Sequence, residues 1–347
     1  MPSGPTGRPA TIYDVAALAQ LSIATVSRVL QGTGPVSDKA RARVDQAAQE
    51  LNYVPLRAAR SLAVQRHEAH GLVLPDLAGP FYGDLLMGYE RWAGEHGQSV
   101  VLTVTHGNPD PLRSVRDLAG RVDGLVVHGN ALGLAAIQEL RRTKVPVVVV
   151  AHPPVTGCDS VRTESAPSAE RLATRLLDHG RRKLLFVGDP ASSYDVSQRY
   201  AGFAKALAAR GLEVPEPERV PLTEAAGGEF AAKLLAAKTA GPDGLVCAND
   251  ELALAALQRL RAGGLEVPGD IVVTGWDDVM AARYVSPGLT TVRQPMAELG
   301  RLAAQRLHER VSGQRTRARN DVLPTELVLR DSCGTASGDA AGTAATD

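Results

Sequence analysis

The sequence predicts a small all-α domain followed by a larger α/β region with parallel sheets. Before Pro55, apolar residues recur at helical spacing in three short runs, each behind a capping residue. From residue 71 onward, short apolar runs alternate with amphipathic helical stretches, which is the pattern of βαβ units. A length of 347 residues fits two or three compact units better than a single core.

Charge is unevenly distributed along the chain. The 38 Lys+Arg balance the 38 Asp+Glu, yet residues 1–70 hold eight Lys/Arg against five acids, which leaves residues 71–347 with three excess acids. A mildly basic first segment suits a partner such as DNA. There are three cysteines without CxxC spacing, no signal-peptide stretch, and no apolar run near the ~18 residues of a membrane span. We therefore expect a cytoplasmic protein without disulfides, cysteine-bound zinc or a membrane partner.

Three helices are expected in the first domain. Thr11 and Asp14 form a predicted capping box at the start of the first helix. Ser22 begins a second helix over residues 23–30, so close behind the first that the pair makes a helix-turn-helix. Ser37 is a good N-cap for the third helix, which ends before Pro55 because the residue before a proline disfavours helical geometry. Three such short helices are typical of a DNA-reading module.

The second helix presents the residues expected to read the major groove. Arg28 can donate two parallel hydrogen bonds to guanine, while Ala24 and the Thr25 methyl group suit the thymine methyl. Ser22 and Ser27 are expected on phosphates. The candidate contacts at this helix are Ser22, Ile23, Ala24, Thr25, Ser27 and Arg28. The alternative is a small helical hairpin with an incidental exposed arginine.

The second region is predicted to contain buried parallel strands covered by helices. Expected strands lie at residues 71–75, 99–105, 124–128, 145–151, 184–188, 244–248 and 271–275, and expected helices at 83–96, 166–180, 200–211 and 251–264. Sheets of this kind bind ligands beyond the carboxyl ends of their strands. There is no P-loop, G-x-G-x-x-G, G-x-S-x-G or H-E-x-x-H motif, so we expect no catalytic residue, cofactor or metal.

Polar and aromatic side chains follow several of these strands. Asn249 follows one strand, Trp276 and Asp277 follow another, and Phe81-Tyr82 follows the first strand and its turn. Carboxylate and amide groups beside aromatic faces are what a sugar requires. The alternatives are that Asn249 caps a helix and that Asp277-Asp278 is a solvated turn.

The first domain resembles the DNA-binding headpiece of LacI/GalR-family repressors. The resemblance lies in residues 11–16, 22–30 and 51–55, and residues 58–62 are similar to that family's hinge helix. It implies that the hinge folds over the operator and that Leu62 wedges into the minor groove. Three positions depart from the family pattern: Gln20 replaces glycine in the turn, where a left-handed backbone would cost roughly 1 kcal/mol, and Gln31 and Leu56 also differ. The predicted DNA-binding set is completed by Thr11, Tyr13, Ser37, Tyr53, Ala59, Arg60 and Leu62.

The second region resembles the effector domain of the same family. Residues 246–251, 267–271, 273–278 and 289–295 carry this resemblance. It implies a fold like the periplasmic sugar-binding proteins, with two subdomains joined by three crossovers and dimerising side by side. The effector-binding residues that we expect are Phe81, Tyr82, Arg199, Asn249, Trp276 and Asp277. His152 and Glu164-Ser165 depart from the family pattern, which leaves the identity of the effector open.

These patterns together give the expected domain boundaries. We expect a helix-turn-helix headpiece over residues 9–56, a hinge helix and linker over 57–69, an effector-binding and dimerisation domain over 70–333, and a disordered tail over 334–347. The N-subdomain is expected at about 70–163 and 292–323, and the C-subdomain at about 164–291 and 324–333.

The expected function is that of a homodimeric transcriptional repressor, with a tetramer as the alternative assembly. Its partners would be double-stranded operator DNA, pseudo-palindromic because the protein is two-fold symmetric, and a small-molecule effector such as a sugar or sugar derivative. Whether the effector induces or corepresses stays open. A sugar-binding transport protein and a sugar-metabolising enzyme are the rival functions.

Overall fold

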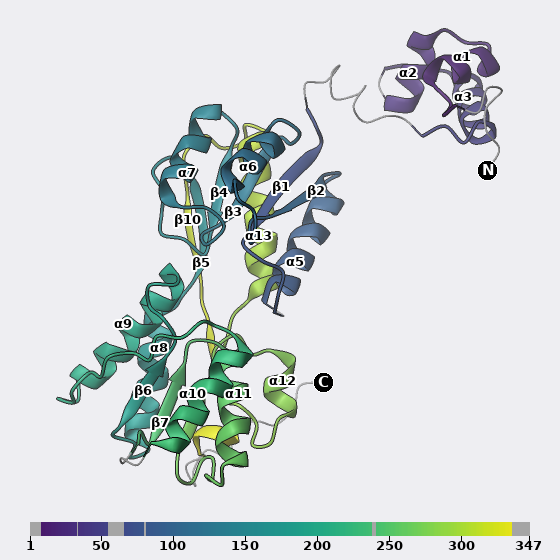
Figure 1. Ribbon diagram of the computed structural model, residues 1–347. Coiled ribbons are helices and arrows are strands. Elements are labelled where there is room, and N and C mark those ends of the chain that lie inside the picture. The colour runs from purple at the N-terminus through teal and green to yellow at the C-terminus, as the bar shows by residue number, and fades with distance from the viewer. Residues whose placement is uncertain (1–7, 33, 55–65, 80, 238–240, 335–347) are drawn as a thin grey trace. The chain divides into compact units, whose positions relative to one another are not determined.

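The computed structural model describes residues 8–32, 34–54, 66–79, 81–237 and 241–334 (Figure 1). The chain divides into two compact units, Met1–His67 and Glu68–Asp347. The predicted hinge residues Ala59, Arg60 and Leu62 lie outside the described residues, and so does the predicted tail over 334–347 except for Gly334. In the part that is described, no helix is long and apolar enough to cross a membrane.

The first unit is a three-helix domain with the predicted caps. Its helices are α1 (Ile12–Ala19), α2 (Ile23–Gln31) and α3 (Asp38–Glu50). The side chains of Thr11, Ser22 and Ser37 each accept a hydrogen bond from the backbone amide three residues on, and the capping box at Thr11 is complete. The helices enclose a small core around the fully buried Val15, Val26 and Val44. The helix-turn-helix prediction is therefore confirmed.

Gln20 occupies the turn between α1 and α2 with a left-handed backbone. Its φ and ψ are 51° and 47°, in the region where a side chain costs roughly 1 kcal/mol relative to glycine. The Gln20 Oε1 atom accepts a hydrogen bond of 3.2 Å from Nη2 of Arg43 on α3. This exposed bond offsets part of the backbone strain by tying the turn to the third helix.

Replacing Gln20 with glycine should stabilise the first unit by up to about 1 kcal/mol, because glycine adopts this conformation without strain. Amide hydrogen exchange of α1–α3 in the full chain would show the gain as slower exchange. Arg43→Ala is the matched control, since it removes the same hydrogen bond and keeps the strain. Faster exchange in Gln20→Gly than in the native chain would contradict the prediction.

The second unit begins with a six-stranded sheet in the order β10-β5-β4-β3-β1-β2, parallel in every pair. Its strands are β1 (Ala69–Leu74), β2 (Ser99–Val104), β3 (Gly124–His128), β4 (Val147–Val150), β5 (Asp159–Thr163) and β10 (Asn320–Leu323). Two cores cover its faces: Leu72 and Val126 face α5 (Phe81–Glu95) and α13 (Met296–Val311), whereas Val73 and Val127 face α6 (Pro111–Ala119) and α7 (Leu134–Leu140).

A second, three-stranded parallel sheet has the order β6-β7-β8. Its strands are β6 (Leu184–Val187), β7 (Gly244–Cys247) and β8 (Val272–Thr274), and they share one core with α8 (Ala166–Asp178), α9 (Tyr194–Ala208), α10 (Glu224–Ala236), α11 (Asp250–Ala262) and α12 (Met280–Tyr284). The short antiparallel pair β9 (Thr291–Arg293) and β11 (Glu326–Val328) lies beside it. All seven predicted strands are present, and β5, β9, β10 and β11 are additional.

The chain crosses three times between the two sheets, as the resemblance implied. The crossings follow β5, β9 and β10, at residues 164–165, 294–295 and 324–325 (Figure 1). The second crossing is later than expected: residues 292–293 were assigned to the N-subdomain, but Val292 is fully buried in the core of the second sheet and pairs with Leu327. We therefore use N-subdomain for residues 69–163 and 296–323, and C-subdomain for residues 166–293 and 326–333.

Candidate functional site

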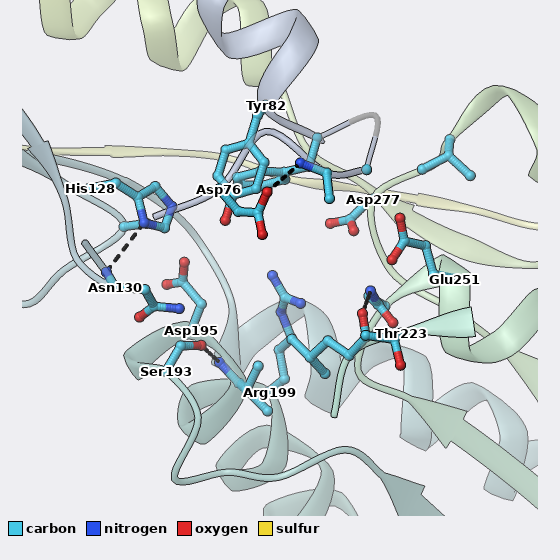
Figure 2. A pocket seen from close by; sticks show the side chains of 18 residues that line it. Asp76, Tyr82, His128, Asn130, Ser193, Asp195, Arg199, Thr223, Glu251 and Asp277 are labelled. Carbon is cyan, nitrogen blue, oxygen red and sulfur yellow. Dashed lines mark hydrogen bonds between the residues drawn. The ribbon is translucent and has the colours of Figure 1, made fainter. Parts of the chain in front are cut away.

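A cleft of about 260 Å³ lies between the N-subdomain and the C-subdomain, beyond the carboxyl ends of strands from both sheets (Figure 2). The N-subdomain contributes Asp76, Phe81, Tyr82, His128 and Asn130, and the C-subdomain contributes Ser193, Asp195, Arg199, Asn249, Glu251 and Asp277. The cleft is where parallel sheets bind their ligands.

Arg199 reaches into the cleft between Asp195 and Asp277 (Figure 2). It comes from the second turn of α9, whose N-cap is Ser193, and only 6% of it is exposed. Its Nη1 donates a 2.5 Å hydrogen bond to the carbonyl oxygen of Ala248, and its guanidinium lies 4.5 Å from the centre of the Trp276 ring. Burial lowers the pKa of Arg199, and the neighbouring carboxylates oppose that shift. Among the described residues that line the cleft, Arg199 is the one with a permanent positive charge.

Four carboxyl groups face this single guanidinium. Burial raises the pKa of Asp277 to about 7, and its Oδ1 accepts a 2.6 Å hydrogen bond from Nε2 of Gln294. Burial also raises the pKa values of Asp195 and Glu251, and within the described chain Oδ1 of Asp195 has no hydrogen-bond partner. The backbone amides of Ala78 and Leu77 lower the pKa of Asp76. The cleft thus offers several acceptors for hydroxyl or amine donors and little to attract an anion.

An aromatic wall forms the N-subdomain side of the cleft. The ring centres of Phe81 and Tyr82 are 5.1 Å apart, and those of Tyr82 and His128 are 5.6 Å apart. Burial lowers the pKa of His128 to about 4, so its ring is neutral at pH 7, and burial raises the pKa of Tyr82 to about 12. A flat apolar ligand face can pack against these rings while its polar edges meet the carboxylates.

Asn249 both caps a helix and lines the cleft. Its Oδ1 accepts a 3.1 Å hydrogen bond from the amide of Leu252 in α11, and its Nδ2 donates to the carbonyl oxygen of Leu222 at 3.2 Å. The alternative that Asn249 is a helix cap is therefore correct, and it leaves the second amide hydrogen for a ligand. The alternative that Asp277-Asp278 is a solvated turn is wrong. Asp277 is half-buried in the wall of the cleft, where it accepts from Gln294, and Asp278 is buried and pairs with Arg293 at 2.7 Å and with Arg330.

The structure brings together five of the six residues expected to bind an effector: Phe81, Tyr82, Arg199, Asn249 and Asp277. Trp276 does not line the cleft; it is 2% exposed and supports the guanidinium of Arg199. The cleft is also lined by six residues that were not expected from the sequence, namely Asp76, His128, Asn130, Ser193, Asp195 and Glu251. Asp76 and His128 lie at the ends of β1 and β3, so the strand-end rule that found Asn249 would have found them too.

The outer face of α2 carries the residues expected to read DNA. Ser22, Ile23, Ala24 and Arg28 are exposed, and Thr25 and Ser27 are half-buried. Nε of Arg28 donates to the carbonyl oxygen of Ala24 at 3.2 Å, which leaves the outer nitrogens of its guanidinium available. Tyr13 is 67% exposed, whereas Tyr53 packs against the small core and burial raises its pKa.

A helix-turn-helix unit joined to a two-subdomain unit with a ligand cleft defines a class of regulatory DNA-binding proteins. The family model for bacterial regulatory proteins of the lacI family matches residues 11–55, and the model for a periplasmic binding protein-like domain matches residues 173–333. The chain belongs to the lacI family, and it is a transcriptional regulator, not an enzyme.

Relatives match over nearly the whole chain. The HTH-type transcriptional regulator DegA of Bacillus subtilis is 32% identical, covering 93% of this chain and 97% of that protein. The ribose operon repressor of Haemophilus influenzae is 31% identical, with coverage of 93% and 98%. A crystal structure of the lac repressor dimer bound to operator and the anti-inducer ONPF has a TM-score of 0.87 at 28% identity and covers 94% of this chain and 100% of that one.

Proposed function

We propose that the protein is a cytoplasmic homodimeric repressor whose operator binding is controlled by an uncharged or amine-bearing sugar in the cleft. The observation that carries the proposal is the convergence of the aromatic wall, Asn249, Arg199 and Asp277 between two subdomains of a chain that begins with a helix-turn-helix. The ribose operon repressor and the lac repressor among the relatives support a sugar and an operator.

The charged groups of the cleft favour a neutral or amine-bearing sugar over a sugar phosphate or a sugar acid. With a pKa of about 7, Asp277 is only partly ionised at pH 7, but the other carboxyl groups of the cleft share the one guanidinium of Arg199, which leaves no second cation to balance a sugar phosphate or sugar acid. Hydroxyl groups, by contrast, donate hydrogen bonds to carboxylates, and such charge-assisted bonds are roughly twice as strong as neutral ones. An effector acts by binding the DNA-competent and DNA-incompetent states with different affinity.

Exposed apolar side chains support a dimer. Met87 on α5 and Met280 and Tyr284 on α12 are large and exposed, with 80% of Tyr284 accessible. A second copy of the chain would cover such side chains in both subdomains. The arrangement of two headpieces on one dimer matches a pseudo-palindromic operator.

Fluorescence anisotropy with the DNA upstream of the protein's own gene tests the proposal, with a scrambled duplex of equal length as control. Sequence-selective binding that shifts when a neutral sugar is added would support it. A response to a sugar phosphate and to no neutral or amino sugar would contradict the proposed effector class. Equal binding of both duplexes, with and without sugars, would contradict operator recognition.

Arg28→Ala should cost about 1–3 kcal/mol of binding free energy at one operator base pair, because Arg28 is proposed to read guanine with two parallel hydrogen bonds. Titration of operators substituted at each position would reveal the base pair at which the variant no longer discriminates. Arg28→Lys is the matched control, since it keeps the charge and removes the paired geometry. An equal loss on random DNA would refute the base-reading role.

A further inference from the structure

We propose that the edge of the N-subdomain sheet at which its strands begin is a second, sequence-independent binding surface for DNA phosphates. We call it the strand-start edge, and it consists of residues 120–123, 141–146 and 312–319, which precede β3, β4 and β10. All strand pairs of this sheet are parallel, so the segments that precede its strands lie along one edge.

The strand-start edge carries exposed cations on each of its segments. Arg121 precedes β3, Arg142 and Lys144 precede β4, and Arg317 precedes β10, and all four are exposed. In the part of the chain that is described, Arg142, Lys144 and Arg317 show no ion pair, and Arg121 donates only to the carbonyl oxygen of Asp117 in the preceding helix α6. Residues 71–347 have an excess of three acids, so the positive charge of this edge is opposite in sign to the net charge of the region to which it belongs.

A buried ion network holds the third segment of the edge in place. Asp159, which is fully buried at the start of β5, accepts a 2.5 Å hydrogen bond from Nη1 of Arg315, and the same arginine contacts Glu309 at 2.9 Å. Arg306 contacts Asp321 at 2.7 Å. The acids of the network are thereby neutralised, and residue 317 is left on the outside of a fixed loop.

Opposing charges at the same edge are few. Asp117 and Glu95 are exposed near the ends of α6 and α5, and Arg319 contacts Asp321 at 3.1 Å. Asp123 within the edge and Glu68 before β1 are half-buried acids. Six exposed cations, Arg141 and Arg319 included, therefore face two exposed and two half-buried acids. Lysine and arginine that neutralise phosphates without reading bases release counterions, which makes binding steeply dependent on salt.

DNA is the polyanion that the connection to the helix-turn-helix unit keeps near this edge. The segment that comes from the helix-turn-helix unit enters β1 at the strand-start edge, and only residues 55–68 separate Val54 from Ala69. A chain of that length spans at most about 50 Å. A duplex held by α2 therefore stays within reach, and the cations would contact the phosphates that flank the operator.

The test compares two triple variants of the full chain that carry the same change of charge. Arg142→Gln, Lys144→Gln and Arg317→Gln neutralise the strand-start edge, while Arg113→Gln, Lys233→Gln and Arg259→Gln neutralise exposed cations elsewhere in the second unit. Each protein is titrated by anisotropy with a random-sequence duplex of 20 base pairs and one of 60 base pairs, at salt concentrations from 50 to 300 mM.

We expect the edge variant to bind the long duplex roughly tenfold more weakly than the native chain near 0.1 M salt, with a salt slope shallower by about one unit for each lost phosphate contact. The control variant should match the native chain. A loss on both duplex lengths would also support the surface and would place its contacts within the 20 base pairs of the shorter duplex. Native affinity and slope in the edge variant, or an equal loss in the control, would overturn the proposal. Native-like tryptophan fluorescence would show that each variant is folded.

Discussion

Replacing Asp277 with asparagine is expected to weaken effector binding more than tenfold and to stabilise the second unit at pH 8. The carboxylate can accept hydrogen bonds on both oxygens, whereas the amide has one acceptor, so at least one charge-assisted hydrogen bond worth about 1.5–3 kcal/mol is lost. Asparagine keeps the oxygen that accepts from Gln294 at 2.6 Å, so the fold around it is preserved.

The stability gain follows from the raised pKa of Asp277, about 7 in the folded protein against an ordinary 3.8. Between about pH 4 and 7 the folded chain keeps a proton that the unfolded chain releases. The free energy of unfolding of the native protein therefore falls as the pH rises through this window. Asparagine resembles the protonated acid, so the variant lacks this fall. At 1.36 kcal/mol for each pKa unit, the difference reaches at most about 4 kcal/mol above pH 7.

Urea unfolding followed by tryptophan fluorescence measures this difference, because both tryptophans, Trp92 and Trp276, belong to the second unit. Asp278→Asn is the control on the neighbouring residue, and it should destabilise the protein at pH 8 because it removes the carboxylate that Arg293 and Arg330 share. If the free energy of unfolding changed with pH in the same way for the native chain and Asp277→Asn from pH 4 to 8, the raised pKa of Asp277 would be contradicted. An unchanged affinity of Asp277→Asn for the effector would refute the role of Asp277 in the binding site.

The strands found by sequence are those whose apolar runs are continuous. β3 and β4 are buried along their whole length, and their runs of apolar residues, which include Val126 and Val148, predict a strand directly. β5 and β10 were not predicted because they begin with Asp159 and Asn320, and polar residues of these types are typical of loops. The burial of Asp159 in a strand is understandable only once the arginine that neutralises it is known. That arginine, Arg315, lies 156 residues further along the chain.

The candidate site shows the same limit. The start of α9 was placed at residue 200, but the helix begins at Tyr194, and the missed turns contain Asp195 and Arg199. Both side chains are buried toward the cleft, where they break the apolar periodicity that identifies a helix. Asp277 and Asp278 are adjacent in sequence and equivalent in type, yet one lines the cleft and the other binds two arginines, Arg330 being 52 residues distant. Only the tertiary structure separates these roles.

Gly300→Ala is expected to destabilise the second unit by about 1–3 kcal/mol or more, although alanine favours helices, because a methyl group at this crossing overlaps a neighbouring backbone. Gly300 of α13 packs against α5, and its added Cβ would collide with the carbonyl oxygen of Leu85 and approach the amide nitrogen of Tyr89 to 3.0 Å. Gly88 of α5 makes the reciprocal approach to Ala297. Backbone atoms cannot rotate aside as a side chain can, so the two helices must separate.

Gly94→Ala provides the matched control on α5, since its added Cβ would meet only Oε1 of Glu90, at 3.7 Å. There the intrinsic preference for alanine should prevail and stabilise the unit by up to about 1 kcal/mol. Opposite signs for the two substitutions in urea unfolding would establish the close crossing, and a gain in both would refute it. Because α5 also begins with Phe81 and Tyr82, a separation of α5 from α13 displaces the aromatic wall. Gly300→Ala should therefore weaken effector binding even under conditions in which the protein stays folded.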